Sequence, residues 1–196
     1  MKSAVSSVRG CKTRSMRHFT ISELEAGIDH VIDAPAESGV LSLIVRRPSE
    51  GEREVIEVGQ LDLTEGLRGD SWRVRSGAAE GVRDTYNQIN VMSARAISLI
   101  AGEPERWQLA GDQLYLDFDI SEDNLPAGTR LAIGEAVIEV SAMPHTGCQK
   151  FSQRFGVDAL RFVNSEAGRK LRLRGFNAHV VMPETIRQGD AVLRQA

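Results

Sequence analysis

Short apolar runs recur along the whole chain, and their internal spacing distinguishes two kinds of segment. In residues 113–118 apolar and polar side chains alternate, which is typical of a strand with one buried face. In Leu24, Ile28 and Val31 the spacing is three or four residues, which is typical of one face of a helix. The strand-like runs prevail, and Gly and Pro separate them at short intervals. We therefore expect a mainly β protein with a few short helices.

The first expected unit is a helix followed by a hairpin. Ser22 and Glu25 have the spacing of a capping box, and the helical stripe that follows ends before a proline. Two β-rich runs then lie on either side of a turn at residues 48–51. The expected strands are residues 40–45 and 53–58. We expect residues 19–58 to pack against the domain formed by residues 59–196.

The second part of the chain is expected to form a barrel, because several short strands with regular turns favour a barrel over alternating strands and helices. Ser93 is placed to cap a helix that ends at Gly102, Cys148 lies where another helix begins, and Asp158 is placed to cap a third. The expected strands are residues 88–91, 113–118, 129–133, 136–140, 178–181 and 191–193. The expected fold class is a β-barrel with short helices and an α+β appendage at the N-terminus.

Length and composition fit one folded domain. The chain has 196 residues, 41% hydrophobic and 26% charged, which is ordinary for a globular protein with a full core. Its net charge of −3 argues against general nucleic-acid binding, which needs a basic surface. No apolar run approaches the roughly 20 residues of a membrane span. The oligomeric state does not follow from these features.

The two cysteines, Cys11 and Cys148, are too few for a disulfide framework. We expect both to be reduced and the protein to be cytoplasmic. Residues 1–18 contain several Lys and Arg residues and no acidic one. Three interpretations remain open for this segment: a disordered basic tail, an extension before a true start at Met16, or a targeting peptide.

Arginines gather around a long polar segment at residues 76–84. A loop of this length in a compact domain is often functional, and guanidinium groups pair bidentately with phosphate oxygens. The arginines in or beside it are Arg68, Arg73, Arg75 and Arg83. They are candidates for holding the phosphate of a cofactor, and the alternative is a solvated loop. A second basic cluster in residues 161–174 is interpreted first as a solvated face, with an acidic partner or a cofactor phosphate as the alternative.

A strand-to-helix junction lies at Asn90, Ser93 and Arg95. The free backbone N–H groups at the start of a helix can hold an anion, so these three residues are candidates for a cofactor site. Helix capping alone explains Ser93 equally well.

The chemistry is expected at Cys148. The strand before it ends at Pro144, since proline cannot donate to a sheet, and a short turn leads into the helix. The residues of the turn are His145, Thr146 and Gly147. Free N–H groups at a helix start favour a thiolate, and Lys150 and His145 lie nearby in the sequence. A thiolate is both a nucleophile and a soft metal ligand.

Cys148 also has a structural interpretation. It shares a helix face with Phe151 and Phe155, and free cysteine is often a core residue. A structural zinc site is disfavoured because His145 and Cys148 supply only two ligands. The sequence contains no Gly-x-x-x-x-Gly-Lys, His-Glu-x-x-His or Cys-x-x-Cys motif.

The segment Pro144-His-Thr-Gly-Cys-Gln-Lys-Phe151, with Arg154-Phe-Gly156 after it, resembles the cysteine motif of the MOSC family, named for the C-terminal domain of molybdenum cofactor sulfurases. Further segments follow the order that this family shows. They are Gly66-Leu-Arg-Gly-Asp70, Gln88-Ile-Asn-Val-Met-Ser-Ala-Arg95, Gly111-Asp112-Gln-Leu114, Glu122-Asp-Asn-Leu125 and Gln188-Gly-Asp190. The resemblance thus extends over most of the chain.

The resemblance implies a barrel-like domain in which the motif cysteine, here Cys148, carries sulfur or ligates the molybdenum of a pterin cofactor. Relatives reduce N-hydroxylated compounds on that cofactor, so we expect molybdenum cofactor binding and consider reductase activity with a redox partner. The alternative is a sulfur carrier that accepts persulfide sulfur from a separate pyridoxal-phosphate-dependent cysteine desulfurase. The expected cofactor-binding residues are His145, Thr146, Gly147, Lys150, Asn90, Ser93, Arg95, Arg73 and Arg75.

Overall fold

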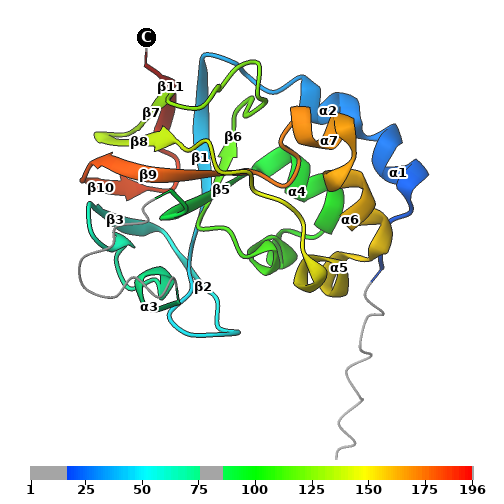
Figure 1. Cartoon of the computed structure of the whole chain (residues 1–196), viewed down its shortest axis with the longest axis horizontal. Helices are drawn as coiled ribbons and strands as arrows, with labels where there is room; N and C mark the ends of the chain where they lie inside the picture. Colours follow the sequence, from blue (N-terminus) through cyan, green and yellow to red (C-terminus); the bar gives the residue numbers. More distant parts are fainter. Residues whose placement is uncertain (1–16, 76–85, 196) are drawn as a thin grey trace, which may run out of the picture.

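Within residues 17–75 and 86–195, which the computed structural model describes, seven strands close into a barrel (Figure 1). Strand β11 closes it because it pairs with both β7 and β1. Neighbouring strands are antiparallel except β5 and β6, which run parallel. Around the barrel the strands are β11 (Ala191–Arg194), β7 (Arg130–Ile133), β8 (Ala136–Val140), β9 (Phe176–Met182), β5 (Ile89–Ser93), β6 (Leu114–Asp117) and β1 (Ser38–Arg46). The fold class expected from the sequence is confirmed.

Strand β1 is part of the barrel wall. Its first residues pair with β11 and the following ones with β6. Residues 40–45 were expected in a hairpin outside the barrel, whereas their pairing makes them a wall strand. The end of β1 does pair with β2 (Glu54–Ile56) in the expected hairpin. The second expected strand, residues 53–58, is divided between β2 and β3, which belong to different sheets.

A second, smaller sheet of three strands lies beside the barrel in the described part of the chain (Figure 1). It consists of β10 (Thr185–Arg187), β3 (Val58–Asp62) and β4 (Gly66–Leu67). Strand β10 was not expected from the sequence. This strand forms because Ile186 is fully buried and pairs with Gly59.

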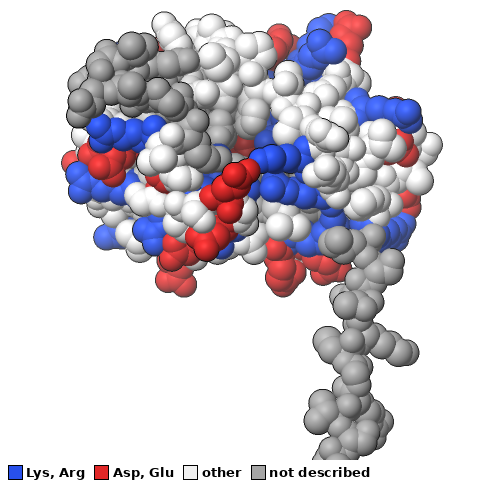
Figure 2. Space-filling model, turned by 60° about the horizontal axis from the view of Figure 1, so that its bottom comes forward, with Lys and Arg blue, Asp and Glu red and all other residues white. Residues whose placement is uncertain are grey.

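Short helices cover one side of the barrel, and α3 lies apart from them (Figure 1). The helices on this side are α1 (Ile21–Ala26), α2 (Ile28–Ile32), α4 (Ala94–Ala101), the 3-10 helix η1 (Pro104–Ala110), α5 (Gln149–Phe155), α6 (Val157–Asn164) and α7 (Glu166–Lys170). The separate helix α3 consists of Trp72–Arg75. None of the helices in residues 17–75 and 86–195 has the length and apolarity needed to cross a lipid bilayer. On the face drawn in Figure 2, basic side chains lie among acidic ones.

Two hydrophobic cores result from this arrangement. One fills the barrel and includes Leu114 and Leu116, and the other lies between the barrel wall and the helices and includes Tyr115. Strand β6 therefore has two buried faces, and the expectation of one buried face is wrong because the helices cover its outer side. The hydroxyl group of Tyr115 donates to the carbonyl of Trp107, 2.9 Å away, in a 3-10 helix that the sequence analysis did not expect.

The helix caps were predicted with mixed success. Ser93 caps α4 as expected, since its hydroxyl oxygen accepts from the N–H of Ala96 at 3.2 Å. The expected cap at Ser22 is wrong, because the capping box is formed by Thr20 and Glu23. Asp158 does not cap α6, and its carboxylate instead accepts from the N–H of Ile21 at 3.3 Å.

Gly39 marks the point where β1 leaves β11 and approaches β6. A Cβ at this position would lie 2.1 Å from the carbonyl oxygen of Asp117, a backbone atom that cannot move alone. We predict that Gly39→Ala lowers the free energy of unfolding by about 1–3 kcal/mol, as overpacking does, measured by urea denaturation. Ser38→Ala, at the exposed preceding residue, should change it by less than about 0.5 kcal/mol. Equal effects of the two substitutions would contradict the close approach.

Candidate functional site

Cys148 ends the loop that connects β8 to α5. It is the N-cap residue of α5, and its carbonyl accepts from the N–H groups of Phe151 and Ser152 at 3.0 and 3.1 Å. Its side chain is exposed and its thiol is free. The alternative that Cys148 belongs to the hydrophobic core is therefore wrong, although Phe151 and Phe155 are core residues as that pattern indicated. Cys11 lies outside the described residues.

A cavity of about 550 Å³ opens beside this loop. Its walls come from four segments: the connection between β6 and β7, the loop after β8, the α6–α7 region, and the segment that leads into β9. Among its lining residues are Ser141, His145, Thr146, Arg169, Arg172 and Arg174. Cys148 follows Thr146 by two residues and is not one of the lining residues. The cavity and the thiol are thus neighbours along one short loop.

Three members of the second basic cluster contribute to the cavity wall. Arg174 is buried and pairs with Asp112 at 2.7 Å. Arg172 is partly buried and donates to the carbonyl of Leu125 at 2.7 Å. Arg169 is exposed and donates to the carbonyl of Asn164 at 2.9 Å. The interpretation of this cluster as a solvated face is wrong for Arg174.

Three residues of the cavity wall carry a buried polar atom without a hydrogen-bond partner. These atoms are Ser141 Oγ, His145 Nδ1 and Arg174 Nε, and the statement holds for partners among the described residues. A buried polar group without a partner costs about 1–3 kcal/mol. Because the atoms themselves are buried, they lie beneath the surface of the wall and do not face the space of the cavity.

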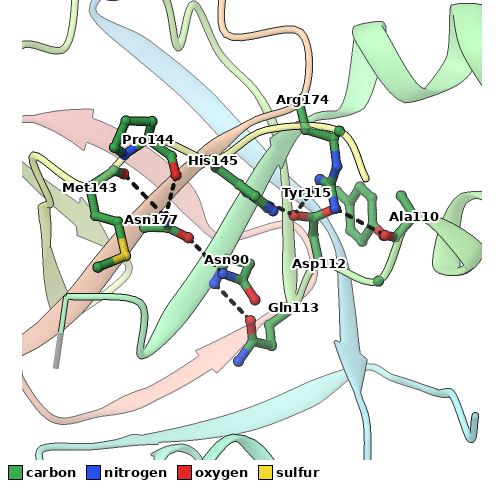
Figure 3. A network of polar contacts seen from close by, with 12 residues as sticks. Asn90, Ala110, Asp112, Gln113, Tyr115, Met143, Pro144, His145, Arg174 and Asn177 are labelled. Carbon is green, nitrogen blue, oxygen red and sulfur yellow. Dashed lines mark hydrogen bonds and ion pairs between the residues drawn. The ribbon is translucent and has the colours of Figure 1, made fainter. Parts of the chain in front are cut away.

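His145 is held neutral near pH 7. Burial lowers its pKa to about 4, and the nearby positive charges of Arg174 and Arg47 act in the same direction. Asp112 opposes them, with its Oδ1 3.5 Å from His145 Nδ1 (Figure 3). A neutral imidazole in the cavity wall has one donor and one acceptor nitrogen.

A buried polar network supports the loop from below (Figure 3). The Asn177 amide nitrogen lies 3.1 Å from the carbonyl of Met143 and 3.3 Å from that of Pro144 and donates to them. The amide oxygen of Asn177 accepts from Asn90 at 2.8 Å. The oxygen of Asn90 in turn accepts from Arg47 at 2.9 Å. Asn90 is thus a support for the loop and is not a lining residue of the cavity.

Arg47 carries the charge of this network. It is buried and pairs with the fully buried carboxylate of Asp70 at 2.7 Å, and it donates to the carbonyl of Gly111 at 2.7 Å. Neither Arg47 nor Asn177 was predicted from the sequence as a site residue. Asp70 and Asp112 belong to segments that resemble the family's motifs, but the resemblance did not indicate what their side chains do.

Several other predicted site residues have structural partners elsewhere. Arg95 pairs with Asp117 at 2.6 Å and donates to the carbonyls of His30 and Asp33. Lys150 is exposed and pairs with Glu50 at 3.0 Å.

The two strand-to-helix junctions do not share the cavity. Ser93 is buried as a helix cap, and neither it nor Arg95 lines the cavity. Arg73 is exposed on α3, and the side chain of Arg75 and all of Arg83 lie outside what the structure describes. His145, Thr146 and Gly147 are therefore the predicted residues that do adjoin Cys148.

Metal binding by protein side chains alone finds no support. Within residues 17–75 and 86–195, no three His, Cys, Asp or Glu side chains are grouped so that they could hold a metal ion.

The sequence was compared with family models, curated proteins and solved structures. The model of the MOSC domain matches residues 81–193, more than half of the chain. The chain belongs to the MOSC domain family. No curated protein matches it.

Solved structures agree with this MOSC protein in fold. YuaD from Bacillus subtilis aligns with a TM-score of 0.57 and 15% identity, over 79% of this chain and 94% of that one. YiiM from Escherichia coli aligns with a TM-score of 0.52 and 17% identity, over 80% and 70%. YiiM from Geobacillus stearothermophilus gives 0.54 and 15%, over 81% and 75%. At these identities the likeness concerns the fold alone.

The ion pair of Arg47 and Asp70 should matter for stability. We predict that Arg47→Met lowers the free energy of unfolding by about 3–5 kcal/mol, because it leaves a buried carboxylate without its cation. Arg130→Met, which removes the exposed ion pair with Glu139, is the control and should cost less than about 1 kcal/mol. Urea denaturation of both variants at pH 7 measures the difference. Similar decreases in the free energy of unfolding would show that the buried ion pair stabilises the protein no more than the exposed one.

His145 should make stability depend on pH. Its pKa is about 4 in the folded protein and near 6.5 when unfolded, so the unfolded chain binds the proton more readily between these values. The contribution of neutral His145 is complete above about pH 6.5 and is lost as the pH falls towards 4, by about 2–3 kcal/mol between pH 7 and 4.5. Urea denaturation across this range should show a smaller decline for His145→Gln than for the native protein. Parallel curves would refute the prediction.

Proposed function

We propose that this MOSC protein binds the molybdenum cofactor in the cavity beside Cys148, with the thiolate of Cys148 as a protein ligand of the metal. The observation that carries the proposal is a cavity lined by three arginines whose loop leads directly to an exposed thiol. The proposal also rests on membership of the family.

The phosphate of the cofactor fits the charge of the cavity wall. Arg169 and Arg172 bring guanidinium groups to the wall, and neither forms an ion pair with a carboxylate among the described residues. Glu122, another lining residue, acts on Arg172 only through its charge. Guanidinium groups pair with phosphate oxygens in bidentate geometry. Arg172 also has positive φ of 49°, a conformation that non-glycine residues adopt rarely and often at functional sites.

The pterin ring would lie against the polar side chains of the wall. Besides the arginines, the lining residues include Ser141, His145 and Thr146, whose side chains can donate or accept hydrogen bonds. A pterin ring also carries both donors and acceptors. These residues would orient the ring, while Arg169 and Arg172 hold the charged end.

Cys148 would then supply the sulfur ligand. A cysteine thiolate is a soft ligand suited to such a metal. When bound, the cofactor would supply a metal centre that changes oxidation state, which the reduction of N-hydroxylated compounds requires. The residues of this chain would bind and orient the cofactor and leave the thiol side open to a substrate and a redox partner.

A second function is favoured by one specific observation. Cys148 is exposed and does not line the cavity, so a donor protein could reach its thiol without entering the cavity. In a sulfur carrier, the thiolate of Cys148 would attack the outer sulfur of a desulfurase persulfide, forming a new S–S bond and releasing the donor thiolate. This transfer needs no added oxidant or reductant.

Analysis of protein purified from a host that makes the cofactor separates the two functions. We predict one molybdenum and one pterin per chain, with molybdenum lost in Cys148→Ser and kept in Gln149→Ala, the neighbouring exposed control. Arg172→Met should reduce the content of both, because the phosphate loses a charged partner.

Intact mass measurement of the same samples tests the alternative. An adduct of about 32 Da at Cys148 without molybdenum would replace cofactor binding with sulfur transfer. Folded protein that carries neither cofactor nor persulfide sulfur would refute both functions.

A further inference from the structure

We propose that Asn164 is a positioning residue for Cys148. The inference deepens the proposed function, because it takes Cys148 as the reactive residue of this site. It rests on the hydrogen bonds of Asn164 with Gly147 and Arg169 and on the close packing of Gly147 against α6, none of which was expected from the sequence.

The carboxamide of Asn164 binds both polar backbone groups of Gly147. Its Oδ1 accepts from the N–H of Gly147 at 2.9 Å, and its Nδ2 donates to the carbonyl of Gly147 at 3.2 Å. Gly147 immediately precedes Cys148, so the two hydrogen bonds restrain the peptide units on both sides of Gly147, the second of which leads into Cys148. A single side chain thus fixes the orientation of the backbone next to the thiol.

The backbone of Gly147 lies directly against α6. A Cβ on Gly147 would be 2.7 Å from Cδ1 of Leu160 and 2.9 Å from Cγ2 of Val163. Because the backbone packs this closely, its N–H and carbonyl need partners on α6 itself. Asn164, the last residue of α6, supplies both.

Asn164 also connects the loop to the cavity. Its backbone carbonyl accepts from Nε of Arg169 at 2.9 Å, and Arg169 lines the cavity together with Val163. At the other end of the loop, Asn177 holds the carbonyls of Met143 and Pro144. The loop between β8 and α5 is therefore restrained at both ends, and Asn164 is the restraint next to the thiol.

Thiol reactivity of protein without cofactor tests the proposal. The rate of Cys148 alkylation by iodoacetamide is followed by peptide mass spectrometry, which separates it from Cys11, over a range of pH. The same cysteine in the urea-unfolded chain is the reference. We expect the native rate profile to differ from this reference, and Asn164→Ala to move it towards the reference by about threefold to tenfold, the effect of losing a hydrogen-bonded restraint.

A matched control distinguishes positioning from general destabilisation. Asn124 also donates to two backbone carbonyls, of Ala36 at 2.9 Å and Asp119 at 2.7 Å, and among the described residues it forms no hydrogen bond with the loop between β8 and α5. Asn124→Ala should therefore leave the alkylation profile of Cys148 unchanged while lowering the melting temperature to a similar extent. A change of equal size in both variants would overturn the proposal.

Gly147→Ala is the second variant, in case Asn164→Ala does not fold. It disturbs the same contact from the loop side and should shift the profile in the same direction. Folded Asn164→Ala or Gly147→Ala with the native profile, or a native profile equal to that of the unfolded chain, would overturn the proposal. Since the measurement needs neither molybdenum nor persulfide, its outcome is independent of which proposed function is correct.

Discussion

The buried carboxylate of Asp112 is the constraint on which the site depends. It is fully buried, and Arg174 is its close cationic partner at 2.7 Å. Because removing one partner of a buried ion pair leaves an uncompensated charge, Arg174 has to remain at the cavity wall. Its guanidinium then lies 5.1 Å from the ring centre of Phe151, a favourable cation–π contact with α5, and its charge opposes protonation of His145. One ion pair thereby links the cavity wall, the helix after Cys148 and the neutral imidazole.

Carboxamides complete this arrangement without adding charge. Asn177 and Asn164 bind backbone groups at the two ends of the loop, and Asn90 connects Asn177 to Arg47. A carboxamide donates and accepts at once, so it can satisfy a carbonyl and an N–H group in a place where a second ion would need its own partner. The loop can therefore be held firmly while the net charge of the cavity wall stays positive, which favours an anionic ligand.

The sequence was sufficient for the barrel and for the location of Cys148, and insufficient for the cavity. Alternating patterns and turn residues predict strands because they depend on neighbours in the chain, and the hairpin of β7 and β8 is an example. The ion pair of Asp112 and Arg174 joins residues 62 positions apart, so no local pattern indicates it. The same limit explains Arg95: the strand-to-helix junction and the cap at Ser93 follow from the local sequence, but the ion pair of Arg95 joins it to Asp117, 22 positions away.

The position of Cys148 outside the cavity wall constrains either proposed function. A cofactor held at its phosphate by Arg172 would have to extend past Thr146 for its metal to meet the sulfur, so the length of the ligand and the restraint of the loop must match. A persulfide donor, in contrast, would need only the exposed thiol and would make no use of the arginines that line the cavity. The placement of Arg169 and Arg172 in the cavity wall is therefore better explained by an anionic ligand in the cavity. Cofactor binding requires both the cavity and the thiol, whereas sulfur transfer requires the thiol alone, and this is the physical reason for ranking cofactor binding first.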